Sequence, residues 1–186
     1  MPILGTIDSQ KSGHLFTAGV FDSIATATVT TSTTVAFTDI PQNYTHLQIR
    51  WQARNNAAVT TADVRMKMNG NPGVTYTYVY TNGSGTITGS AIGSDSAVIL
   101  GRSTGASSTA TYFGAGIYDL FDYTNTTTFK SSFGINTDNQ NTFGNHFYNG
   151  STFLSTSAIT SLTITSEGSD LFVSGSTFAL YGIKGA

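Results

Sequence analysis

The sequence predicts an all-β protein: an antiparallel β-sandwich, jelly-roll-like, with an extended N-terminal arm. The first observation is unbroken alternation over residues 45–54, which places on one face of a single strand Leu47, Ile49, Trp51 and Ala53. The second is composition, because threonine and aromatic residues are frequent and only 10% of residues are charged. Branched and aromatic side chains pack well on a pleated surface. The third is the lack of any amphipathic helical pattern.

Residues 1–20 are expected to form the arm, because they hold few apolar residues and no sustained period. Such a segment needs a surface to lie on. We expect a neighbouring subunit to provide it; folding back on its own domain is the alternative. Residues 21–186 are expected to form one sandwich domain, since 186 residues suit a single core. The expected assembly interface comprises Ile3, Leu4, Ile7, Leu15, Phe16, Tyr181 and Ile183.

In the first half of the chain, turn residues separate the expected strands. Pro41 and Asn43 favour a turn over 39–43, and Asn69-Gly70 begins a second one over 69–73. The central strand, 45–54, directs His46, Gln48, Arg50, Gln52 and Arg54 to solvent by its period. The strand after it repeats the pattern, with Val64, Met66 and Met68 inward. The other strands are expected at 24–29, 33–37 and 74–80.

In the second half, glycine-rich stretches at 81–95 and 101–110 and the Asn-rich stretch 136–145 predict loops. The apolar run 97–100 predicts a short buried strand, and Asn149-Gly150 predicts a tight hairpin. Further strands are expected at 111–121, 127–135, 158–165 and 176–183. The last of them is apolar on both faces, which is typical of a strand deep in a sandwich or at a subunit interface. About ten short strands favour a two-sheet architecture.

Composition also bounds the function. A net charge of −2 leaves no basic stripe for phosphates, so no nucleic-acid partner is expected. No run of 18 apolar residues exists, so no membrane span is expected. The first residues lack the regions of a secretory signal, which favours synthesis in a cytoplasm. Because there is no cysteine, disulfide and thiol chemistry are excluded.

Few residues have a pattern that points to chemistry. The histidines, His14, His46 and His146, lack metal-ligand spacing, so no metal and no cofactor are expected. Asp119 and Asp122 could serve glycoside hydrolysis, but carboxylates near a strand end more often form turns, and no catalytic residue is expected. Tyr76, Tyr78 and Tyr80 share one strand face and could contact a glycan; packing is the favoured interpretation.

Three stretches resemble a family of structural proteins of short tailed bacteriophages, common in cyanophage and environmental phage genomes. They are Ile-Pro-x-x-Tyr-x-His-Leu-Gln-Ile-Arg from Ile40 to Arg50, Met68-Asn69-Gly70-Asn71, and Phe178-Ala179-Leu180-Tyr181-Gly182-Ile183-Lys184-Gly185. The resemblance covers most of the chain from about residue 21. It implies a β-sandwich virion protein, a homotrimer, acting as capsid cement (a decoration protein) or in a tail fibre. No catalytic residue is implied.

We therefore expect a non-enzymatic protein of the phage particle surface: a trimeric decoration protein that binds the major capsid protein and stabilises the head. The head is favoured because no shaft or heptad region would project the chain from a tail. The alternative is a tail-fibre or tail-tip receptor-binding protein that contacts host surface glycan through the three expected loops. A secreted carbohydrate-active enzyme using Asp119 or Asp122 is a third possibility.

Overall fold

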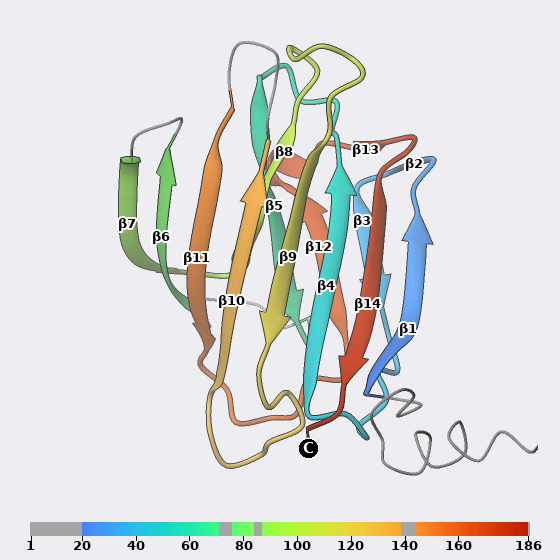
Figure 1. Cartoon of the computed structure of the whole chain (residues 1–186), viewed down its shortest axis with the longest axis vertical. Coiled ribbons are helices and arrows are strands. Elements are labelled where there is room, and N and C mark those ends of the chain that lie inside the picture. The colour runs from blue at the N-terminus through green and yellow to red at the C-terminus, as the bar shows by residue number, and fades with distance from the viewer. Residues whose placement is uncertain (1–19, 71–75, 84–86, 139–143, 186) are drawn as a thin grey trace, which may run out of the picture.

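The chain folds into a sandwich of two antiparallel sheets (Figure 1), which confirms the expected all-β class. The computed structural model describes residues 20–70, 76–83, 87–138 and 144–185. Within these ranges the only helix is a three-residue 3-10 turn, η1 (Glu167–Ser169). The expected arm lies outside them, apart from Val20. The jelly-roll detail and the division into arm and domain remain predictions.

The strands fall into three sheets. The largest has eight strands, in the order β1 (Phe21–Thr28), β14 (Thr177–Ile183), β4 (His46–Ala53), β9 (Gly114–Leu120), β10 (Lys130–Thr137), β11 (His146–Phe153), β6 (Tyr76–Gly83) and β7 (Ile87–Asp95). The second has four, in the order β3 (Thr34–Phe37), β12 (Leu162–Ser166), β5 (Thr61–Met68) and β8 (Val98–Thr104). The smallest pairs β13 (Phe172–Val173) with β2 (Thr31–Ser32).

The chain crosses repeatedly between the two large sheets, so most neighbours within a sheet are distant in sequence. Three pairs of consecutive strands, β6–β7, β9–β10 and β10–β11, stay within the eight-stranded sheet, and β6–β7 forms one edge of it. β8 forms the edge of the smaller sheet and packs beneath β9, β10 and β11. The outer side of the eight-stranded sheet is therefore wider than that of the four-stranded sheet.

The core confirms the expected faces of the first strands. β4 lies between β14 and β9, and its inward residues Leu47 and Ile49 have no exposed surface. Val64, Met66 and Met68 of β5 are equally buried on the facing sheet. Phe178 and Leu180 of β14 complete the same core, while Tyr181 on the other side of β14 remains partly exposed. Burial of this apolar surface is the main stabilising contribution.

Arg54 corrects the expectation for the end of the central strand, because it is buried instead of solvent-exposed. β4 ends at Ala53, and the chain then turns inward. The guanidinium of Arg54 donates to the carbonyl oxygens of Ser108 at 2.7 Å and Thr109 at 2.9 Å, among others in the 105–112 segment. Burial lowers the pKa of Arg54. The side chain thus holds a loop through its carbonyls.

Two of the expected loops contain strands. β7 occupies most of the stretch expected as a loop over 81–95, and β8 continues to Thr104, past the end expected at residue 100. Glycine in β7 has a packing reason, since a Cβ on Gly93 would lie 2.8 Å from the hydroxyl oxygen of Tyr78. Gly93 therefore makes room for the Tyr78 side chain of the neighbouring strand, and Gly89 makes room for that of Asn82. The described residues contain fourteen strands instead of about ten.

The predicted hairpin at Asn149-Gly150 is wrong, because β11 runs straight through both residues. Gly150 pairs with Phe133 on one side and Val79 on the other. The side-chain amide of Asn149 donates to the carbonyl oxygen of Ile99 in the facing sheet. A cross-sheet hydrogen bond and two strand neighbours therefore outweigh the local turn preference of this dipeptide.

Candidate interaction surface

β10 is an amphipathic strand whose apolar side faces outward. Lys130, Ser132 and Asn136 are buried, whereas Phe133 and Ile135 are 47% and 42% exposed. In a sandwich sheet with one solvated face, apolar side chains usually point inward and polar ones outward. Shifting the register of β10 by one residue would restore that usual arrangement. The observed register therefore needs a physical cause on the inner side.

The inner side of β10 and β11 is polar because it faces the edge strand of the smaller sheet. β8 has a neighbour on one side only, so its outer backbone groups need other partners. Asn136 donates from its side-chain amide to the carbonyl oxygen of Arg102 at 2.9 Å, and Asn149 donates to that of Ile99. The two asparagines thus replace the missing strand neighbour of β8, which fixes the register of β10.

A closed set of hydroxyls supports the same region. Tyr118 lies 2.8 Å from the hydroxyl of Ser132 and 2.5 Å from that of Ser151, and the two serine oxygens are 2.7 Å apart. Burial raises the pKa of the Tyr118 hydroxyl to about 12, against the lowering effect of the two serines. All three hydroxyls have partners within the protein, whereas the side-chain oxygens of Asn136 and Asn149 on the same inner side have no hydrogen-bond partner among the described residues.

The apolar side of β10 joins those of its neighbours in a continuous surface, here called the outer sheet face. Ile135 pairs with Ile117 of β9 and Tyr148 of β11, forming one row. A second row runs from Phe133 through Gly150 to Val79 and Ile92. The exposed apolar side chains of the face, which are 37% to 84% exposed, are Val79, Ile92, Ile117, Phe133, Ile135 and Tyr148.

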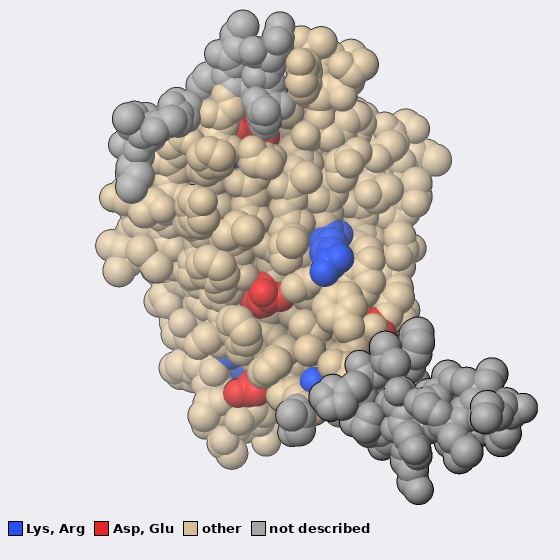
Figure 2. All heavy atoms as spheres, in the orientation of Figure 1, with Lys and Arg blue, Asp and Glu red and all other residues tan. Residues whose placement is uncertain are grey.

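Charge is sparse on the outer sheet face (Figure 2). Arg50 donates from Nε to the side-chain oxygen of Gln48 at 2.8 Å, and Gln48 donates to a carboxylate oxygen of Asp119 at 2.8 Å. The Arg50 guanidinium lies 5.1 Å from the ring centre of Phe21 and 5.4 Å from that of Tyr181. Cation–π contacts with two rings hold the arginine in place.

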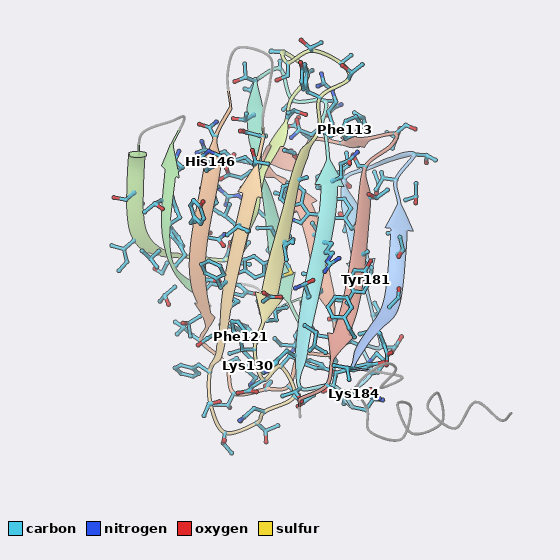
Figure 3. All side chains as sticks on the ribbon, in the orientation of Figure 1. Phe113, Phe121, Lys130, His146, Tyr181 and Lys184 are labelled. Atoms are coloured by element: carbon cyan, nitrogen blue, oxygen red, sulfur yellow. The ribbon has the colours of Figure 1, made fainter. Side chains whose placement is uncertain are left out.

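A shallow groove of about 620 Å³ runs across this face. Ala115, Ala179 and Gly116 are among its small residues, and Tyr148 and Ile135 are among its large apolar ones. In Figure 3, Tyr181 on β14 and His146 at the start of β11 lie on opposite sides of β4, β9 and β10; both residues line the groove. Its lining is mostly apolar, as in surfaces that other molecules cover.

The outer side of the four-stranded sheet has a different character. Arg65 contacts three carboxylates there: Asp95 at 3.0 Å, Glu167 at 2.9 Å and Asp63 at 3.7 Å. A groove of about 730 Å³ on this side is lined by Arg65, Lys67 and Glu167 together with hydroxyl-bearing residues such as Thr163 and Thr165. Ion pairs and hydroxyls are what water-facing strands ordinarily carry.

Of the seven residues expected at the assembly interface, the structure describes two, Tyr181 and Ile183, which lie two positions apart on the same face of β14. Tyr181 lies on the outer sheet face, where its ring stacks on Phe21 with centres 4.9 Å apart. Ile183 is partly exposed and pairs with Phe21 and His46 at the end of the same strand. The remaining five lie outside the described residues: Ile3, Leu4, Ile7, Leu15 and Phe16.

The three tyrosines of β6 differ in access. Tyr76 has no exposed surface, and its hydroxyl accepts from the backbone N–H of Met68 at 2.6 Å, so it is a core residue and not a glycan contact. Tyr78 and Tyr80 are partly exposed, and their rings stack with centres 5.9 Å apart. Only these two remain as candidates for contact with a ligand.

The histidines and the two carboxylates are dispersed. His46 accepts at Nδ1 from the backbone N–H of Asp122 at 3.0 Å, and Asp122 adopts a positive φ of 48° in the turn after β9. Asp119 stays on the strand, bonded to Gln48. His146 lies in the apolar groove, and His14 is outside the described residues. No hydrogen bond in the described part of the chain joins the two carboxylates to a shared partner.

Sequence reasoning missed the outer sheet face. Phe129, Phe133 and Ile135 did identify a strand, but their period alone does not say which side is inward. The signal that was available lies in the other residues of β10, where Ser132, Gly134 and Asn136 form a polar side just as regular as the apolar one.

The comparisons with known proteins add no family. The chain matches no protein-family model, no curated protein and no solved structure. In the described part of the chain there is no group of three or more metal-ligating side chains. None of the described helical residues forms a segment long and apolar enough to span a membrane.

Proposed function

We propose that this chain is a non-enzymatic virion structural protein of a tailed bacteriophage: a homotrimeric decoration protein that binds the major capsid protein and stabilises the head. The observation that carries the proposal is the outer sheet face. An isolated domain rarely turns a strand's apolar side outward over a large, weakly charged area. In a permanent assembly, the same face stabilises contact because apolar area is removed from water.

Two further features support an assembly role. The three sequence stretches that resemble phage structural proteins fall on β4, on the β5 end and on β14, so they mainly encode core strands of the sandwich. Beneath the outer sheet face, buried asparagines join the two sheets, and buried hydroxyls join β9, β10 and β11 within the larger sheet. A decoration protein works mechanically, so interface area spread over many copies resists the pressure of the packaged genome.

The experiment mixes purified protein with expanded phage capsids stripped of decoration and, separately, with host cells. Saturable, stoichiometric sedimentation with capsids is the expected result. A matched variant, Ile117→Lys, places a charge on the outer sheet face and should lose capsid binding. Failure of the wild-type protein to sediment with capsids under any condition would contradict the proposal.

A second candidate, a receptor-binding protein of the tail, has one observation in its favour. Tyr78 and Tyr80 present stacked, partly exposed rings, which suit contact with a sugar ring. Adsorption to host cells that disappears in a Tyr78→Ala/Tyr80→Ala variant, with no binding to capsids, would favour this role over the decoration role.

A further inference from the structure

We infer that the outer sheet face binds a second copy of this chain, and that Arg50 of one copy pairs with Asp119 of the other. The inference rests on the proposed function and adds a second kind of contact to it: a face-to-face pair has two-fold symmetry, so it links a subunit of one trimer to a subunit of another and is not the three-fold contact within a trimer. The inference draws on three properties of the face: its size, its balance of charge and the unused hydrogen-bonding groups of these two side chains.

The size fits a stable contact. Eight strands spaced about 4.8 Å apart, each about 25 Å long, give a face of roughly 900 Å². Specific protein–protein interfaces bury about 800 Å² on each partner. The apolar side chains of the face form two adjacent rows rather than scattered points. A copy of the same face is large enough to cover both rows at once.

The charges of the face complement each other. Arg50 and Asp119 stand on neighbouring strands, and no ion pair joins them within the described chain. Gln48 occupies the Nε donor of Arg50 and one carboxylate oxygen of Asp119. The terminal guanidinium nitrogens of Arg50 and the second oxygen of Asp119 make no hydrogen bond with any described residue.

A surface with one positive and one negative group, each with unused donors or acceptors, is self-complementary. When two copies meet face to face, the arginine of each can reach the aspartate of the other, as an isologous contact requires. The arginine is already held between the rings of Phe21 and Tyr181, so little side-chain freedom is lost on binding. A partner of strongly positive or strongly negative charge would leave one of the two groups unpaired.

The test is a charge exchange followed by sedimentation velocity and light scattering. Arg50→Asp and Asp119→Arg each present two like charges to a copy of themselves, so each alone should associate at least about tenfold more weakly than wild type. An equimolar mixture of the two single variants should form mixed oligomers, and the double variant should associate with itself again. Lys67→Asp, the same charge change on the opposite side of the sandwich, should leave association unchanged.

The outcomes separate this inference from the proposed function. A wild-type protein that stays monomeric at about 100 μM, or single variants that associate like wild type, would overturn the pairing of copies. Capsid sedimentation is measured on the same samples, so a monomer that still binds capsids would leave the decoration role standing. Melting temperatures of all variants are recorded, so that a loss of folding is not mistaken for a loss of association.

Discussion

The two outward surfaces of the sandwich differ in what they offer to water. On the four-stranded sheet, Arg65 gathers three carboxylates and threonines fill the positions between buried residues. On the eight-stranded sheet, the corresponding positions of β9, β10 and β11 are isoleucine, phenylalanine and tyrosine. Both sheets have the same alternation and share one core. This difference is the reason for proposing that a partner covers the outer side of the eight-stranded sheet and not that of the four-stranded sheet.

The largest expected effect comes from disturbing the layer beneath the outer sheet face. A Cβ on Gly116 would lie 2.7 Å from Cβ of Asn136 and 2.8 Å from the Trp51 ring. We expect Gly116→Val to lower the free energy of unfolding by about 3 kcal/mol, because side chains that cross-link the sheets must move. Urea denaturation measures the change. Gly150→Ala is the control, since its nearest neighbour would be Val79 Cγ1 at 3.7 Å and stability should hardly change.

The next effect separates the two surfaces directly. Ile135→Lys puts a charge in the middle of an apolar row and is expected to weaken self-association about 100-fold, because the ammonium loses water when the face is covered. Thr163→Lys makes the same addition on the four-stranded sheet and should have no effect. Sedimentation equilibrium measures the self-association constant of each variant. Equal weakening by the two variants would mean that the surfaces do not differ in function.

On the outer side of the four-stranded sheet, we expect a substitution to change the stability of the fold and not its association. Arg65→Met leaves Asp63, whose side chain is 14% exposed, without one of its two arginine contacts. We expect a loss of about 1 kcal/mol in the free energy of unfolding at pH 7, since the pairs are partly screened by solvent. Thermal and urea unfolding measure it. A change in oligomeric state in this variant would speak against the separation of roles.

The smallest effect is a pH dependence that arises between the sheets. Burial raises the pKa of the Asp138 carboxyl, against hydrogen bonds from Asn145 that lower it. The folded protein therefore binds this proton at a higher pH than the unfolded chain does, so the group destabilises the fold as pH rises through the raised pKa. We expect Asp138→Asn to gain stability relative to wild type at pH 7 and to lose that advantage near pH 4, as measured by thermal unfolding at each pH. A difference that is independent of pH would contradict the assignment.

The sequence predicts much of the sandwich because β4 and β5 alternate regularly between apolar residues that face inward and polar residues that face outward. Their apolar residues, Leu47 and Met66 among them, are inward, and their polar residues are outward. Arg54 is an exception to this alternation and is buried. The alternating pattern of the sequence includes residue 54, but the strand β4 ends at Ala53. Nothing local marks that end, since the carbonyls that receive the guanidinium lie more than fifty residues further along the chain.

The polar residues of β10 show that the strand has two regular sides, but which side faces outward depends on a relation between the sheets. Asn136 and Asn149 face inward since β8 is an edge strand, and that edge exists only once the strand order is set. Gly93 of β7 leaves room for the Tyr78 side chain of β6, a contact between strands that local sequence does not reveal. Periodicity reveals the two sides of a strand, but the partner strands decide which of them is buried.

If another copy or the capsid shell covers the outer sheet face, as we propose, hydroxyl radicals cannot reach its side chains, and hydroxyl-radical footprinting measures this protection. Phe133 and Tyr148 serve as reporters, and their labelling is compared between the wild-type protein at assembly concentration, the same protein on capsids, and the Ile135→Lys variant. The account predicts strong protection of both reporters in the wild type and on capsids, with full labelling in the variant. Equal labelling of Phe133 and Tyr148 in all three samples would contradict it.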